Sequence, residues 1–74
     1  MSREEQWQEL IREYDRLNAE QARLGAEVIR YFGAIGLGES RENPPESTLE
    51  ALEKARAAFY AHWDKMSAWA KANA

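Results

Sequence analysis

The sequence predicts an all-α protein: an antiparallel, coiled-coil-like hairpin of two helices that dimerises into a four-helix bundle. Two stretches, residues 2–35 and 47–73, lack proline and are rich in Glu, Arg, Ala, Leu and Gln, all of which favour helix. The segment 36–46 between them holds two Gly, an Asn and two Pro. Apolar residues recur at alternating steps of three and four in both stretches, which is the spacing of a coiled-coil seam. The 74 residues are therefore expected to form one domain, 1–74.

The first helix, residues 2–35, has a start signal and a continuous apolar seam. Ser2 and Glu5 have the spacing of a capping box, which satisfies backbone N–H groups at the helix start. The seam spans about four heptads and is interrupted by one polar residue, Gln21. Its members are Trp7, Leu10, Tyr14, Leu17, Gln21, Leu24, Val28, Tyr31 and Ile35.

The turn, residues 36–46, combines residues that end helices. Gly36 suits the left-handed position that follows a helix, with Leu37 and Phe32 as the apolar pair of a Schellman motif. Asn43 precedes two prolines, and Asn-Pro-Pro cannot continue a helix because proline lacks an N–H and restricts the residue before it. The segment therefore reverses the chain.

The second helix, residues 47–73, repeats these signals. Ser47 and Glu50 have capping-box spacing, and a start at Pro44 capped by Asn43 is the alternative. The apolar spacing gives a seam whose polar member is an arginine. This seam consists of Leu49, Leu52, Arg56, Phe59, Trp63, Met66 and Ala70.

The two seams are expected to pair from the turn outward. This antiparallel alignment places Trp63 near Gln21 and makes the indole a core residue. It also places Arg56 beside Val28 and Glu27, which predicts an ion pair between the helices. The pairing therefore fixes both a register and a polar contact that the structure can test.

A hairpin of this size buries little apolar surface, and the sequence predicts that it binds a protein partner. The cost of ordering about 60 residues, roughly 1.5 kcal/mol each, approximately cancels what so small a core returns. The expected partner is a second copy, another protein, or both. The alternative is a monomer in which Trp69 folds over the end of its helix. Apolar and small residues off the seams form the predicted interface: Ile11, Gly25, Ile29, Tyr60 and Trp69.

The sequence offers no catalytic, cofactor-binding or metal-binding group. Cysteine is absent, and no Gly-x-Ser-x-Gly motif occurs. An all-helical site of the chorismate mutase type needs several cations inside a bundle, and only Arg56 is predicted to face inward. The only histidine is His62, and no metal ligand lies three or four residues from it, at Ala58, Phe59, Lys65 and Met66.

We therefore expect no enzyme, no cofactor and no small-molecule substrate. The expected function is a non-enzymatic protein–protein interaction module, such as a small adaptor, an assembly subunit or a protein inhibitor. An apolar flank of the hairpin would form the binding surface, because charged side chains are already solvated by water whereas an exposed apolar patch is not.

A stripe of arginines on the first helix gives the alternative function, a dimeric regulator that binds nucleic acid. Its four arginines fall within about 40° of one another on a helical wheel. Such a stripe resembles the bundle face with which Rop-type proteins bind RNA. Glutamates fill the adjacent sector at spacings that favour pairing within the helix, which makes this alternative the weaker one. The arginines are Arg12, Arg16, Arg23 and Arg30, and the glutamates are Glu9, Glu13, Glu20 and Glu27.

Composition bears on location and on broad classes of partner. The formal net charge is −3, which argues against non-specific binding of nucleic acid. No apolar run approaches the roughly 20 residues of a membrane span, and the first five residues lack the apolar core of a signal peptide. We therefore expect a cytoplasmic protein without membrane contact.

A short pattern around the turn is shared with a known family. It consists of an Asn-Pro turn followed by a helix with early leucines, and it rests on Asn43, Pro44, Leu49, Ala51 and Tyr60. In this pattern the chain resembles the small needle-type subunits of bacterial secretion systems. The resemblance covers less than a third of the chain and assigns no functional residue.

Overall fold

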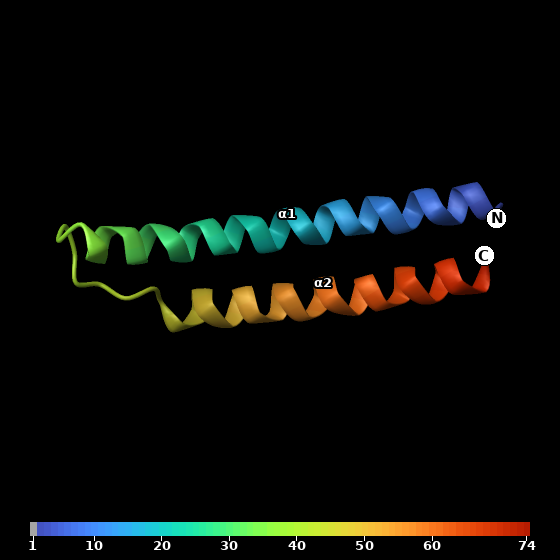
Figure 1. Cartoon of the computed structure of the whole chain (residues 1–74). Coiled ribbons are helices and arrows are strands. Elements are labelled where there is room, and N and C mark those ends of the chain that lie inside the picture. Colours follow the sequence, from blue (N-terminus) through green and yellow to red (C-terminus); the bar gives the residue numbers. More distant parts are fainter. Residues whose placement is uncertain (1) are drawn as a thin grey trace.

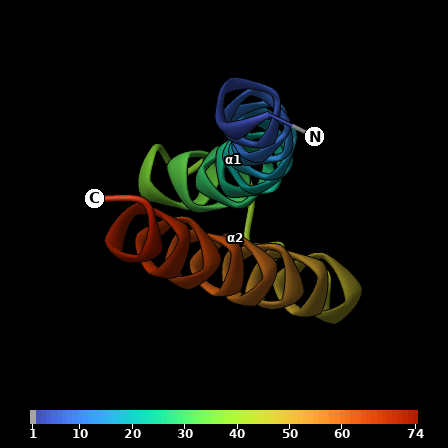
Figure 2. The same ribbon diagram turned by 90° about the vertical axis from the view of Figure 1, so that its right-hand side faces the viewer.

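The computed structural model describes residues 2–74, so residue 1 of the predicted domain lies outside the described residues. Two helices, α1 (Arg3–Gly36) and α2 (Glu46–Ala72), pack against each other, and this part of the chain contains no strand. The hairpin is antiparallel, with both termini at one end and the turn at the other (Figure 1). Seen along its length, the two helices cross rather than run strictly side by side (Figure 2). The all-α hairpin is thus the observed fold, with helix bounds within one residue of the predicted ranges.

The start of α1 is capped by Ser2, as the sequence predicts. Its hydroxyl oxygen accepts a hydrogen bond from the Glu5 backbone N–H at 3.1 Å, and the hydroxyl donates to the Glu5 carboxylate at 2.9 Å. This arrangement satisfies one of the free N–H groups at the helix start. It also places a carboxylate near the positive end of the helix dipole.

The end of α1 is a Schellman motif, but it lies two residues later than predicted. Gly38, not Gly36, has the left-handed backbone, with φ of 74°. The N–H of Glu39 donates to the carbonyl of Ala34 at 2.9 Å, and the N–H of Gly38 donates to that of Ile35 at 3.1 Å. Gly36 and Gly38 can both take the left-handed backbone that ends a helix. Helical hydrogen bonding continues through Gly36, so the helix ends with Gly38 in that position.

The start of α2 also differs from the predicted capping box. The helix begins at Glu46, directly after Pro45, and no side chain caps it. Ser47 therefore lies inside the first turn and not before it, and the alternative start at Pro44 is wrong as well. Pro44 is instead buried, so the end of the connecting loop is packed against the hairpin. Pro45 takes the N-cap position, where its fixed φ suits entry into a helix and its carbonyl accepts hydrogen bonds from the N–H groups of Thr48 and Leu49.

The core of the hairpin is small. The buried side chains of the two helices are Leu10, Leu24, Val28, Leu52, Ala55 and His62, and among the described residues no large side chain is fully enclosed. Most of the core lies toward the turn, where Leu24, Val28, Leu52 and Ala55 form one cluster that Ala51 extends. A core of this size leaves most apolar side chains in contact with solvent.

The seam of α1 is the predicted one, whereas that of α2 is rotated. Arg56 and Trp63 are exposed, so their prediction as seam residues is wrong. The buried and half-buried residues of α2 form a neighbouring ladder with the same steps of three and four, about 50° around the helix. This seam consists of Leu52, Ala55, Phe59, His62, Met66, Trp69 and Asn73.

The register differs from the prediction by one heptad. The ring of Trp63 lies 6.4 Å from the ring of Tyr14, which is seven residues before the predicted neighbour Gln21. The predicted ion pair of Glu27 with Arg56 is therefore wrong. Heptad seams permit such slips, because moving one helix by seven residues places apolar positions opposite apolar positions again.

The molecule is an elongated rod. Its principal extents are 54 × 17 × 15 Å and its radius of gyration is 16.9 Å, against about 11 Å for a compact domain of this length. Of the described helices, neither has the length and apolarity needed to cross a membrane.

Candidate protein-binding faces

The hairpin has two lateral faces, because its helices touch along a single seam. In an antiparallel pair, residues that directly follow seam residues lie on one side of both helices, and residues that directly precede them lie on the other. We call the first side the apolar face. Within the helices, its apolar and glycine members are Ile11, Ala22, Gly25, Ile29, Phe32, Gly36, Leu49, Tyr60, Trp63 and Ala70, and its polar members are Gln8, Asp15, Asn18, Glu53, Arg56 and Ser67. We call the second side the polar face; its charged members are Glu9, Glu13, Arg16, Glu20, Arg23, Glu27, Arg30, Lys54 and Lys65.

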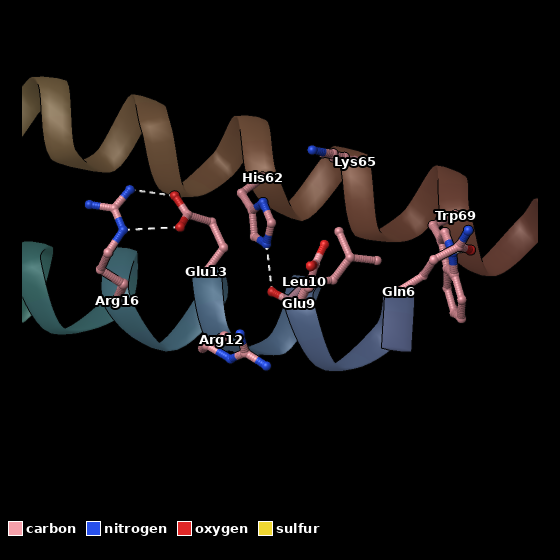
Figure 3. Close-up of a pocket in the computed structure, with 9 residues that line it drawn as sticks. All are labelled: Gln6, Glu9, Leu10, Arg12, Glu13, Arg16, His62, Lys65 and Trp69. Carbon is pink, nitrogen blue, oxygen red and sulfur yellow. Dashed lines mark hydrogen bonds and ion pairs between the residues drawn. The ribbon is translucent and has the colours of Figure 1, made fainter. Parts of the chain in front are cut away.

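The polar face contains a shallow groove between the first half of α1 and the second half of α2 (Figure 3). His62 lies at its floor and is buried. Its Nε2 is 2.8 Å from the carbonyl oxygen of Leu10, and because a carbonyl only accepts, Nε2 carries the proton and donates. This hydrogen bond joins the two helices. The groove is lined by Gln6, Glu9, Leu10, Arg12, Glu13, Arg16, His62, Lys65 and Trp69.

Two arginines of the predicted stripe are held by glutamates of α1. The Arg16 guanidinium contacts both carboxylate oxygens of Glu13 (Figure 3), and Arg23 donates to Glu20 at 2.7 Å. These hydrogen bonds lower the pKa of Glu13 and of Glu20 and raise the pKa of Arg16 and of Arg23. The pairs partly neutralise the stripe before any ligand arrives.

The other two arginines of the stripe, Arg12 and Arg30, are exposed. Arg12 comes from α1 at the edge of the groove and extends away from His62 (Figure 3). The stripe therefore combines two paired guanidinium groups with two that face solvent.

The apolar face carries an aromatic group in its middle third. Phe59 lies in the seam, and its ring centroid is 5.2 Å from that of Tyr14 and 5.8 Å from that of Tyr60. Trp63 extends this group outward from the seam, 6.5 Å from Phe59. Trp63 is 53% exposed and Tyr60 63%, so two large aromatic rings lie against solvent on one side of α2.

A second apolar group lies on the same face nearer the turn. Ile29 is 70% exposed, and Phe32 and Leu49 are also exposed. Between the two groups, α1 contributes Gly25, and a Cβ built there would meet nothing within 4 Å. Packing within the hairpin therefore does not explain this glycine, which leaves a shallow place between two apolar groups.

The structure brings four of the five predicted interface residues to the apolar face. Ile11 and Gly25 are half-buried there, and Ile29 and Tyr60 are exposed. Trp69 lies elsewhere: it belongs to the seam, stacks on Trp7 at a centroid distance of 5.4 Å, and donates from Nε1 to the Gln6 side chain at 3.1 Å. The rotation of α2 moves this ring from the flank into the space between the helices.

Three exposed residues of the apolar face were missed as surface candidates. Trp63 and Leu49 were assigned to the seam of the second helix, and Phe32 to the end of the first. The signal that separates the two ladders of α2 is Arg56, since burying its guanidinium without a partner is costly. The rotation of α2 explains why Trp63 and Leu49 are exposed.

The side chains of residues 2–74 include no group of three or more acidic or histidine side chains that could hold a metal ion. Arg56, the one cation predicted to face inward, is exposed. The groove on the polar face presents one imidazole, already engaged with a backbone carbonyl, among paired and solvated charges. The groove therefore consists mainly of charged side chains that are paired with each other or in contact with solvent.

Comparison of the chain with protein family models, curated proteins and solved structures gave no match. The two lateral faces are therefore the basis for assigning a function.

Proposed function

We propose that this chain is a non-enzymatic protein-interaction module that acts through its apolar face, in the manner of an adaptor, an assembly subunit or a protein inhibitor. The observation that carries the proposal is the sorting of side chains. Large apolar groups in contact with solvent gather on one side of the hairpin, and ion pairs gather on the other. Exposed apolar patches of this kind mark surfaces that bind another protein.

The simplest use of this face is to pair two hairpins into a four-helix bundle. The rotated seam supports this arrangement, because α2 carries two adjacent ladders. Leu52, Phe59 and Met66 belong to both ladders, so one helix has apolar side chains toward α1 and toward a further layer. Helices with two such sides are typical of bundles of more than two helices.

The test compares a charge placed on each face. Trp63→Glu puts a carboxylate into the aromatic group, and the double change Arg16→Glu, Arg23→Glu reverses the stripe on the polar face. Light scattering behind size exclusion gives the mass of each variant over a range of concentrations. We expect the wild type and the polar-face variant to reach twice 8.5 kDa, and Trp63→Glu to stay at the monomer mass.

Nucleic-acid binding by Arg12, Arg16, Arg23 and Arg30 is the competing function, and it has less support because two of the four guanidinium groups are already paired. Fluorescence anisotropy of a labelled RNA stem-loop measures it with the same variants. Tight binding that is lost in the polar-face variant and kept in Trp63→Glu would contradict the proposed function. Circular dichroism of each variant establishes that it is folded.

A further inference from the structure

We propose that the partner on the apolar face is a second copy of this chain, running in the opposite direction, with a two-fold axis that passes between Glu53 and Arg56. This inference rests on the proposed function and adds the identity and the orientation of the partner. Each step below uses the positions of residues on the apolar face and the register between α1 and α2.

The surface area indicates a partner of about the size of the hairpin itself. The chain exposes 5,718 Å². A compact monomer of 8.5 kDa is expected to expose about 4,650 Å², which leaves an excess of about 1,060 Å². A standard protein interface buries about 800 Å² on each partner. One lateral face of the 54 Å rod has this area, so docking along its whole length accounts for the excess.

Two pairs of residues on the apolar face of α1 are placed symmetrically about one point, whereas Ile29 has no counterpart on this face. Ile11 and Phe32 lie on the apolar face, one before and one after the position midway between residues 21 and 22. Asn18 and Gly25 also lie at equal distances from that point. A reversed copy of α1 would therefore place Ile11 against Phe32 of the other copy, and the Asn18 side chain at the shallow place left by Gly25.

The face of α2 has the same symmetry. Leu49 and Tyr60 lie at equal distances from the point midway between Glu53 and Arg56. A reversed copy places Leu49 against Tyr60, and it places Arg56 against Glu53, so that two ion pairs form across the interface. Trp63 then lies over the apolar group near the turn of the other copy.

The two centres of symmetry lie at about the same height along the rod. Contacts across the seam join Trp7 to Trp69, Tyr14 to Phe59 and Trp63, and Leu10 to His62, so the residue numbers of facing positions add up to between 72 and 77. The centre on α1 between residues 21 and 22 and the centre on α2 between Glu53 and Arg56 give a sum within this range, so they lie within about one helical turn of each other. One two-fold axis therefore serves both helices, which is what an isologous interface requires.

Charge favours this orientation over a parallel one. In a parallel pair, α2 of one copy would cover α1 of the other, and Glu53 and Arg56 would face the uncharged Asn18, Ala22 and Gly25. Charges covered without a partner are costly, whereas the reversed copy pairs each of them. Within residues 2–74, the ion pairs are Glu13–Arg16 and Glu20–Arg23, so Arg56 is available for a pair with another copy.

A charge-exchange series tests the pairing. Arg56→Glu and Glu53→Arg each place like charges across the axis, and each is expected to raise the dimer dissociation constant roughly 10-fold, measured by sedimentation equilibrium. The double variant restores opposite charges and is expected to return to within about 3-fold of wild type. Arg30→Glu makes the same change on the polar face and serves as the matched control. A double variant as weak as the two single variants would overturn the pairing.

Spin labels test the orientation, and the absence of cysteine makes single labels simple to place. Gln8→Cys and Asn18→Cys both put a label on exposed positions of α1. With the axis proposed here, the two labels at residue 8 lie about 40 Å apart along the rod and the two labels at residue 18 about 10 Å apart. In a parallel dimer the labels at residue 8 would lie as close together as those at residue 18, which would overturn the orientation.

Failure of this inference is distinguishable from failure of the proposed function. A dimer that Trp63→Glu dissociates, but whose labels at residue 8 are close, keeps the apolar face and rejects the orientation. A wild type that is monomeric at every concentration rejects the second copy as partner. A dimer that Trp63→Glu does not weaken rejects the apolar face itself.

Discussion

Single residues decide where α2 rests on α1. Two ladders in α2 have the same spacing and share Leu52, Phe59 and Met66, so periodicity alone does not separate them. The seam uses the ladder with Ala55, His62 and Trp69, although the other ladder contains more apolar residues. It does so because Arg56 remains in solvent, His62 reaches the Leu10 carbonyl, and Trp69 stacks on Trp7. These are contacts between particular atoms, which a hydrophobic pattern does not encode.

The two tryptophans of α2 should therefore differ in their effect on stability. Trp69→Ala removes the stacked ring and the hydrogen bond to Gln6, and we expect it to lower the free energy of unfolding by about 2–3 kcal/mol. That loss corresponds to a fall in melting temperature of about 8 °C or more. Trp63→Ala removes a ring that is half in solvent, and at concentrations where the chain is monomeric it should cost less than half as much. Thermal unfolding followed by circular dichroism measures both, and the opposite order would contradict the seam.

His62 is expected to fix the register more than the stability. In His62→Leu the hydrogen bond to Leu10 is lost, worth about 0.5–1.5 kcal/mol, while the apolar seam gains a leucine. The melting temperature should therefore change little. A slip by one heptad, to the register predicted from the apolar pattern, should however become accessible, because a polar contact within a seam specifies its alignment.

Paired cysteines distinguish the two registers. Cysteines at positions 9 and 65 report the observed register, because both positions line the groove at the same level, and cysteines at positions 16 and 65 report the register moved by one heptad. We expect oxidation to link the first pair in the wild-type background, and the second pair to react faster once His62 is leucine. If the substitution leaves both rates unchanged, the hydrogen bond does not hold the register.

At the scale of elements, the sequence predicted what depends on near neighbours in the chain. The seam of α1, its cap at Ser2 and the reversal at 36–46 follow from spacing and from the limits that proline and glycine place on the backbone. The left-handed residue after α1 was misplaced by two positions because Gly36 and Gly38 both suit a left-handed turn. The rotation of α2 could not be predicted in this way, since it depends on contacts with residues about 50 positions away.

The ion pairs of α1 make its stability depend on pH. Hydrogen bonds from Arg16 and Arg23 lower the pKa of Glu13 and Glu20 from 4.5, so the unfolded chain binds more protons in the interval below that value. The contribution of both pairs is therefore fully present above about pH 4.5 and is lost as the pH falls through the lowered values. Both pairs are exposed, so the effect should be small and weakened by salt.

The comparison that isolates this effect is the wild type against the double variant Glu13→Gln, Glu20→Gln. Melting temperatures are measured from neutral pH down to pH 2 at low and high salt. The wild type should be the more stable protein at neutral pH and low salt, and the difference should shrink at low pH or in salt. A difference that stays constant with pH would mean that other carboxylates determine the acid sensitivity.

At the scale of the whole molecule, the sorting of the surface into an apolar and a polar face follows from the rotation of α2. Turning α2 by about 50° exposes Trp63 and Leu49 on the same face as Ile29, and it withdraws Trp69 from the surface. Four of the five interface candidates lie on the apolar face because they lie off both ladders or on α1, whose seam was identified correctly. The exposure of Trp63 and Leu49 could not be predicted, because it is a property of the pair of helices and not of either helix alone.

The position of the two chain ends has a mechanical consequence. The start of α1 and the end of α2 lie at the same end of the rod (Figure 1), where Trp7 stacks on Trp69. A pulling force between them would load that stack first and then open the seam one turn after another toward the loop. Because only a few contacts bear the load at any moment, the two helices should separate progressively from this end and at low force. Tethers at residue 2 and in the loop would instead pull along the axis of α1, so the seam would not open turn by turn from one end.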